Sequence, residues 1–312
     1  MHDRKASHGG ISLRGAPHWL RPAIWLDGRP RGDVAFLARV GPTLRRRGRV
    51  ICAAELVPTL PTGAPLMAVP FERPLALGRA TLTLTPAGSG PGAACLHVVQ
   101  DGRRVSIATA YRPRPLYGAA APALDRCDVL ALDAEEAALE PIGDAALDAA
   151  LQTLIARAGR DGGLLVVDDV AVALHAAVRL ADAAALTLPA PVLRAWAAAT
   201  AVGRVAAPAR GTGRPATRIT VLGPAAATRR SDALPRLILR SDRTASDEPA
   251  RGWETLPFGW RARGRELDAA VAEARPREVV CWGAGAPALA ARLARSGTPV
   301  TELVDGAQLA LL

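Results

Sequence analysis

The stretch that most constrains the fold is a set of strand-like segments, two of which are joined by a tight turn. Residues 79–85 alternate polar and apolar side chains with a period of two, which is typical of a strand with one buried face. Further on, the apolar runs 95–99 and 105–107 flank the dipeptide Asp101-Gly102, and Asp-Gly between apolar runs is a strong hairpin signal. The sequence therefore predicts neighbouring strands here, with a hairpin at Asp101-Gly102.

Strands and helices alternate in the middle of the chain. Residues 145–160 carry apolar side chains at helical spacing and end in a glycine-rich turn. The apolar strand 164–167 follows, then a predicted helix at 172–185 and a strand at 217–222. This alternation indicates an inserted α/β unit.

The two ends of the chain predict further elements of a larger domain. Residues 11–26, split by two prolines, suit the first strands of a sheet, and residues 34–37 suit a buried strand. Residues 235–239 are expected to resume the main domain as a strand, and a helix is expected at 266–274.

Charge is the main compositional signal. The 312 residues carry a net charge of +10, and Lys5 is the only lysine, so the cationic groups are almost all arginines. Such a surface is what a protein needs to bind a phosphate backbone, because each neutralised phosphate releases counterions. A coding bias that places Ala and Arg throughout the chain explains the same composition, and both interpretations stay open.

Nothing in the pattern of apolar residues or cysteines predicts a membrane or secreted protein. No apolar run approaches the ~20 residues that cross a bilayer, and the first ten residues lack the apolar segment of a secretory signal. The four cysteines are far apart and form no Cys-x-x-Cys pair, which favours neither a disulfide framework nor a structural zinc site. We therefore expect a cytoplasmic location.

Several segments, taken in order, resemble one family. They are Trp25-Leu26-Asp27-Gly28-Arg29-Pro30, residues 33–42, residues 69–78, the loop Pro86-Ala87-Gly88-Ser89-Gly90, residues 105–112, residues 256–267 and residues 276–283. Together they resemble, over nearly the whole chain, the β-CASP branch of the metallo-β-lactamase-fold nucleases. This branch includes DNA-ligase-associated exonucleases and RNA 3′-end processing nucleases.

The resemblance implies an α/β (α+β) fold, a metallo-β-lactamase-like αββα sandwich with an inserted β-CASP-like α/β domain. Residues 1–145 and 235–312 would form the sandwich and residues 146–234 the insertion. In the family, motifs rich in His and Asp hold two zinc ions at the sandwich. The positions that match those ligands are here Leu37, Arg39, Gly41, Pro42, Ser89, Ala110, Trp260, Arg261 and Trp282.

A catalytic zinc needs about three nitrogen or oxygen donors and an open position for water, and these residues do not supply them. Only Asp133 matches an acidic position of the family. The resemblance therefore implies a chain with no metal, no cofactor and no catalytic residue. The alternative is a metal-dependent nuclease or hydrolase with a relocated site.

Arginines at the lost positions suggest another role for the cleft. In the family fold Arg39 and Arg261 converge on the metal site, and guanidinium groups bind phosphate well. We predict phosphate binding by these two, together with the run Arg45, Arg46 and Arg47. Two alternatives remain open. One or both of these arginines point to solvent or pair with Asp133, and the run of three arginines is a solvated loop.

The function that follows by analogy is that of a non-catalytic nucleic-acid-binding or regulatory partner subunit. Its partners would be single-stranded DNA or RNA, an active β-CASP nuclease homologue, or a DNA-repair or RNA-processing protein. A purely structural scaffold is a further alternative. Asp168-Asp169, at the end of a predicted strand, either binds Mg²⁺ with other carboxylates or caps the next helix.

Overall fold

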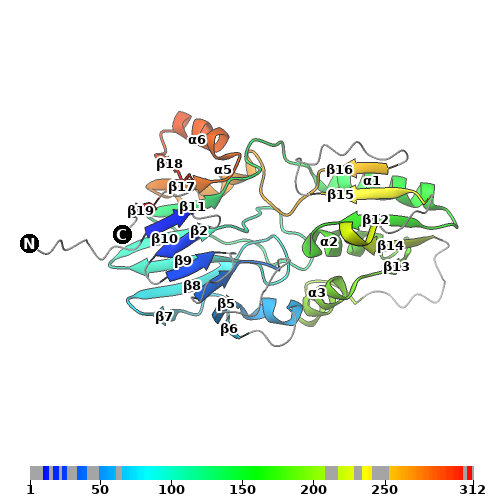
Figure 1. The fold of residues 1–312 in the computed structure, drawn as a ribbon, viewed down its shortest axis with the longest axis horizontal. Helices are drawn as coiled ribbons and strands as arrows, with labels where there is room; N and C mark the ends of the chain where they lie inside the picture. Colours follow the sequence, from blue (N-terminus) through cyan, green and yellow to red (C-terminus); the bar gives the residue numbers. More distant parts are fainter. Residues whose placement is uncertain are drawn as a thin grey trace, which may run out of the picture.

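The computed structural model describes residues 10–13, 17–20, 23–26, 34–40, 49–60, 65–207, 217–227, 234–240, 253–304 and 308–310. These residues form three sheets with helices, a mixed α/β fold of the class that the sequence predicts (Figure 1). Within these ranges, no helix combines the length and the apolar content that crossing a membrane requires.

The first sheet has seven strands in the order β19-β1-β2-β3-β4-β5-β6. Their bounds are β1 Gly10–Leu13, β2 Pro17–Leu20, β3 Ala23–Leu26, β4 Val34–Leu37, β5 Arg49–Ala53, β6 Leu66–Val69 and β19 Gln308–Ala310. A 3₁₀ helix, η1 (Ala54–Thr59), follows β5. The strand predicted at 34–37 is confirmed, as are strands within 11–26.

The second sheet also has seven strands, in the order β18-β17-β11-β10-β9-β8-β7. Their bounds are β7 Leu75–Leu77, β8 Ala80–Pro86, β9 Ala94–Gln100, β10 Arg103–Ala108, β11 Val129–Asp133, β17 Glu278–Trp282 and β18 Val300–Glu302. The predicted hairpin is confirmed: β9 and β10 are antiparallel, and both Asp101 and Gly102 have positive φ. An Asp-Gly turn of this kind matches the twist of the flanking strands.

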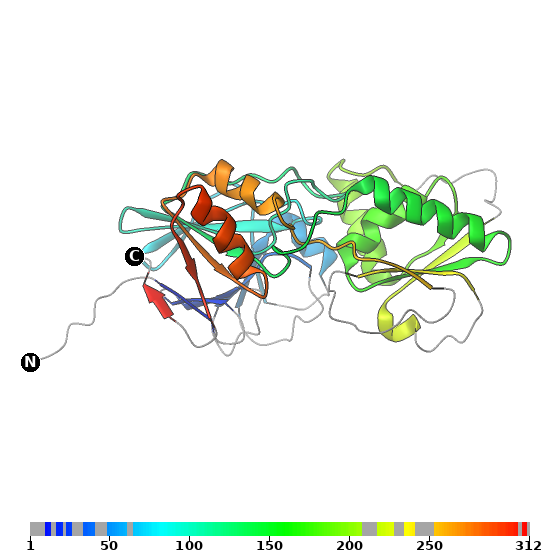
Figure 2. The same cartoon turned by 90° about the horizontal axis from the view of Figure 1, so that it is seen from above.

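One apolar core joins these two sheets. It contains Phe36 and Ile51 of the first sheet, Leu84 and Leu96 of the second, and Leu289 of a helix. Helices α5 (Glu266–Ala274) and α6 (Ala286–Arg295) lie above the second sheet in Figure 2, and the blue strands of the first sheet lie below it. The second sheet is thus covered on both faces, which explains why β11 is apolar along almost its whole length.

A third, entirely parallel sheet forms the middle unit, in the order β13-β14-β12-β15-β16. Its elements are α1 Asp144–Ala158, β12 Gly163–Val167, α2 Val170–Leu180, β13 Ala185–Thr187, α3 Ala190–Ala201, β14 Arg218–Leu222, α4 Pro224–Ala227, β15 Arg236–Leu239 and β16 Trp253–Leu256. The strand-helix alternation predicted for this region is confirmed.

The boundary that we predicted after residue 234 is wrong. Instead of resuming the main domain, β15 pairs in parallel with β12, with Leu165 opposite Leu237, and β16 then pairs with β15. The middle unit therefore extends to Leu256. A short apolar run suits either sheet, and packing against neighbouring strands decides which sheet it joins.

Candidate functional site

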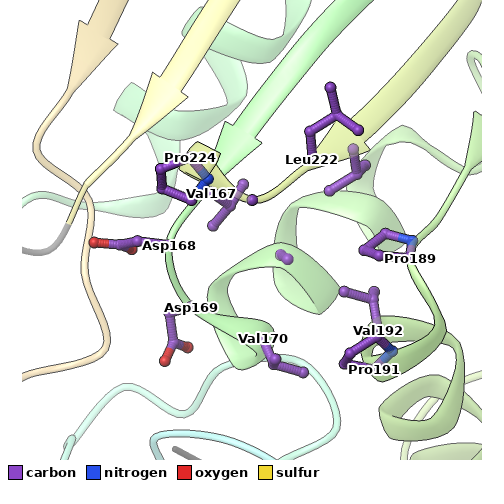
Figure 3. A pocket seen from close by; sticks show the side chains of 12 residues that line it. Val167, Asp168, Asp169, Val170, Pro189, Pro191, Val192, Leu222 and Pro224 are labelled. Atoms are coloured by element: carbon purple, nitrogen blue, oxygen red, sulfur yellow. The ribbon is translucent and has the colours of Figure 1, made fainter. Parts of the chain in front are cut away.

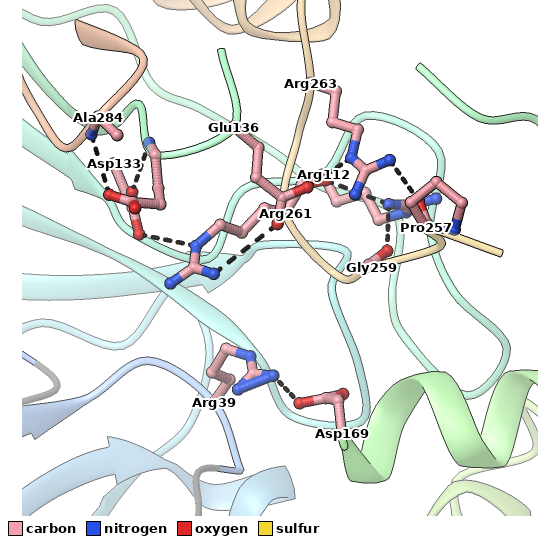
Figure 4. Close-up of polar contacts among 11 residues, drawn as sticks. Arg39, Arg112, Asp133, Glu136, Asp169, Pro257, Gly259, Arg261, Arg263 and Ala284 are labelled. Atoms are coloured by element: carbon pink, nitrogen blue, oxygen red, sulfur yellow. Dashed lines mark hydrogen bonds and ion pairs between the residues drawn. The ribbon is translucent and has the colours of Figure 1, made fainter. Parts of the chain in front are cut away.

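The carboxyl ends of several strands meet at one place between the second sheet and the middle unit. Strands β11 and β17 are parallel neighbours, with Asp133 opposite Trp282. Arg39 follows β4 of the first sheet, and the segment after β16 crosses the same place. The residues that gather here, which we call the cleft cluster, are Arg39, Asp133, Glu136, Asp169, Trp260, Arg261 and Arg263. Figure 4 labels all of them except Trp260.

Arg261 lies between two carboxylates in Figure 4. Its Nε is 3.3 Å from Oδ2 of Asp133, and its Nη1 is 3.8 Å from Oε1 of Glu136. Pairing with Asp133 is one of the alternatives that the sequence left open. Phosphate binding by Arg261 stays a prediction, and the phosphate would have to compete with both carboxylates.

Arg39 joins the first sheet to the middle unit. Its Nη2 donates to Asp169, and its Nη1 donates to the carbonyl oxygen of Val40 at 2.9 Å. Its guanidinium carbon lies 3.7 Å from the centroid of the Trp260 ring, and that of Arg261 lies 4.4 Å from it. The indole thus stabilises two neighbouring cations by cation–π contact.

Asp169 has a second role as the N-cap of α2. Its Oδ1 accepts from the backbone N–H groups of Ala171 at 2.9 Å and Val172 at 3.1 Å, while Oδ2 accepts from Arg39. The capping alternative is therefore confirmed for Asp169. The carboxylate serves both the helix and the contact between the two units.

Glu136 and Arg263 form the most deeply buried pair of the cluster. Arg263 donates through Nε to Glu136 and through Nη1 to the carbonyl oxygen of Pro257. Burial raises the pKa of Glu136, and the charges of Arg263 and Arg261 oppose this rise. Burial likewise raises the pKa of Asp133, opposed chiefly by Arg261.

Charges balance within the cleft cluster. The guanidinium groups of Arg39, Arg261 and Arg263 face the carboxylates of Asp133, Glu136 and Asp169. Arg112 fixes the crossing segment by donating to the carbonyl oxygens of Gly259 at 2.8 Å and Arg261 at 3.3 Å. The cluster is an internal ion-pair network and has no surplus cation with which to attract phosphate.

The remaining predicted positions that the structure describes supply no set of metal donors. Ser89 and Ala110 are fully buried, Trp282 is almost fully buried and Leu37 is partly buried. Gly41, Pro42, Arg45, Arg46 and Arg47 lie outside the described residues. In the described ranges, no three or more His, Cys, Asp or Glu side chains are grouped so as to hold a metal ion.

Two carboxylates of the cluster, Asp169 and Glu136, were missed by the sequence analysis as partners of its arginines. Asp169 is 130 residues from Arg39 in the chain, and Glu136 is 127 residues from Arg263. No local spacing connects residues so far apart. The only available signal was that Asp169 ends a predicted strand.

A small pocket lies next to the cluster, at the carboxyl ends of β12 and β14. It measures about 190 Å³, below the ~300 Å³ typical of sites for larger organic ligands. Figure 3 shows Asp168 and Asp169 on one side and the apolar side chains of Pro189, Val192 and Leu222 on the other. Of these carboxylates, Asp169 is already engaged by Arg39 and by α2.

Comparisons with known proteins bear on the fold. No family model matches this chain, and no curated protein matches it. A crystal structure titled as a protein of unknown function from Enterococcus faecalis V583 is similar, with a TM-score of 0.57 and 12% sequence identity. The match covers 91% of this chain and 82% of that chain. At this identity the likeness shows a shared fold and nothing about activity.

Proposed function

We propose that this chain is a non-catalytic member of the β-CASP branch of the metallo-β-lactamase-fold nucleases, and that it binds single-stranded nucleic acid as a partner subunit. Two seven-stranded sheets with one core, and a parallel unit inserted between β11 and β17, support such a sandwich with its insertion. Helices α5 and α6 supply one outer layer, on the second sheet. The other outer helical layer of an αββα sandwich has no counterpart among the described residues.

The cleft cluster is the observation that carries the non-catalytic part of the proposal. In the family, the positions that match Arg39 and Arg261 belong to a site that holds two zinc ions. In this chain both arginines stack on Trp260 and pair with carboxylates. Guanidinium groups repel divalent cations, and the neighbouring Leu37, Ala110 and Trp282 offer no suitable donor. The donor set therefore fits an ion-pair network better than a site that activates water.

The charge of the chain supports the nucleic-acid part. A net charge of +10, carried almost entirely by arginine, attracts a polyanion over a distance comparable to the Debye length. Because the cleft cluster is neutral, this surplus lies elsewhere on the chain.

Binding and cleavage can be measured in one experiment. End-labelled oligodeoxythymidylate and oligouridylate are titrated with the full chain at about 50 and about 200 mM salt, in the presence of Zn²⁺ or Mn²⁺. We expect binding that weakens steeply with salt, and oligonucleotides that stay at full length. Absence of binding at the lower salt would refute the nucleic-acid role, and shortened products would favour a relocated hydrolytic site.

A further inference from the structure

A second charged site lies at the opposite end of the strands that lead to the cleft cluster. It is an open hollow of about 500 Å³ at the amino ends of β11 and β17, beside the β9–β10 turn. Strand β11 separates it from Asp133 by five residues, about 17 Å. The residues that line this arginine hollow are Gly102, Arg104, Arg126, Cys127, Asp128, Arg275 and Arg277.

The arginine hollow has the surplus of positive charge that the cleft cluster lacks. Four guanidinium groups face it, with Asp128 as the one carboxylate in its lining. Asp128 accepts from the backbone N–H of Arg104 at 2.9 Å and lies 3.6 Å from Nε of Arg277, whose side chain is 88% exposed. Within the described ranges, Arg104, Arg126 and Arg275 make no ion pair with a carboxylate.

Arg275 holds a backbone conformation that favours a different residue. It ends α5 with φ 44° and ψ 55°, in the left-handed region, and its N–H donates to the carbonyl oxygen of Val271. Glycine or asparagine is usual at this position, and a long side chain there costs backbone energy. An arginine in this strained backbone conformation is consistent with a functional role for its positive charge.

We propose that the arginine hollow binds the phosphodiester backbone of single-stranded nucleic acid. The inference rests on the proposed function and places its binding surface away from the cleft. The hollow is open and spans the adjacent strands β10, β11 and β17, about 10 Å across. Its lining offers no aromatic ring on which a base could stack. Binding through phosphates alone is therefore expected to be independent of base sequence.

Paired variants test this site on the full chain. Arg126→Ala with Arg277→Ala removes two charges from the hollow, and Arg160→Ala with Arg194→Ala removes two exposed charges from the middle unit as a matched control. Arg275→Gly removes a third charge and suits the left-handed backbone, so we expect the folded state to be retained. Affinity for labelled oligodeoxythymidylate is measured by fluorescence anisotropy at the two salt concentrations.

We expect the hollow pair to lower affinity about tenfold at the lower salt and to reduce the salt slope by about 1.4, whereas the control pair changes little. Arg275→Gly should weaken binding several-fold. Lysine in place of both Arg126 and Arg277 should largely restore the affinity that alanine at these positions removes. If wild type binds the oligonucleotide and the hollow variants bind it as tightly as the control pair does, binding at the arginine hollow is refuted and the proposed function stands. If wild type does not bind, both proposals fail.

Discussion

Replacing Arg39 by methionine is expected to destabilise the protein by about 3 to 5 kcal/mol. The side chains of Arg39 and Asp169 are only 10% and 9% exposed, so the substitution leaves a carboxylate buried without its cation. Losing one partner of a buried pair typically costs this much, since the remaining charge is poorly hydrated and has lost its counter-charge. The measurement is the free energy of unfolding from urea titration.

A double-mutant cycle separates the charge from the packing. Asp169→Asn keeps an N-cap for α2 while removing the negative charge. The combination with Arg39→Met should therefore be more stable than Arg39→Met alone. Arg157→Met is the exposed control, because its pair with Glu254 is 3.9 Å long and the side chains are 58% and 39% exposed. We expect a loss of at most about 1 kcal/mol there. An equal loss for Arg39→Met and the control would show that Asp169 does not depend on Arg39.

Acidification is expected to destabilise the protein through His175. This buried side chain of α2 accepts at Nδ1 from the backbone N–H of Tyr117 at 2.9 Å, and it stacks against Phe258 with ring centroids 5.6 Å apart. Burial, and then the charge of Arg179, lower its pKa to about 4, whereas Asp144, 3.3 Å from Nε2, opposes the shift. Arg112 adds a smaller lowering effect.

The sign of the pH effect follows from which state binds the proton. Between pH 6.5, the ordinary pKa, and about pH 4, the unfolded chain holds a proton on His175 that the folded chain does not. Stability therefore falls as the pH is lowered through this window, by about 1.4 kcal/mol per pH unit and roughly 3 kcal/mol in all.

His175→Gln removes this titration and keeps a side-chain oxygen able to accept from Tyr117. We expect wild type to lose about 2 kcal/mol more than the variant between pH 7 and pH 5, measured by urea titration at both values. Groups common to both proteins, His97 among them, cancel in this difference. Parallel stability curves for wild type and variant would contradict the lowered pKa of His175.

Elements with a strong local pattern were predictable from the sequence. The period-two alternation before residue 86, the Asp101-Gly102 turn and the helix at 266–274 all appear with nearly the predicted bounds. Each is determined by residues within one element, by side-chain periodicity or by the φ values that a turn requires. The inserted α/β unit was predictable for the same reason.

Pairings made across the fold were not predictable. Arg39 was placed at the cleft by resemblance, but its partner Asp169 lies in another unit and was interpreted only as a cap or a Mg²⁺ ligand. Residues 235–239 were expected to resume the main domain as a strand, yet they pair with β12 of the middle unit. Apolar strands and arginines carry no local signal of their partners, which are chosen by packing and charge balance in the folded chain.

Metal content is the most direct test of the claim that arginines and carboxylates fill this cleft in place of a metal pair. The full chain is purified without chelators from cells grown with added zinc and manganese, dialysed, and analysed by mass spectrometry of the elements. We expect no stoichiometric metal, and no gain in thermal stability when either ion is added back. About two zinc or manganese ions per chain, as in a two-metal hydrolase, would contradict the claim.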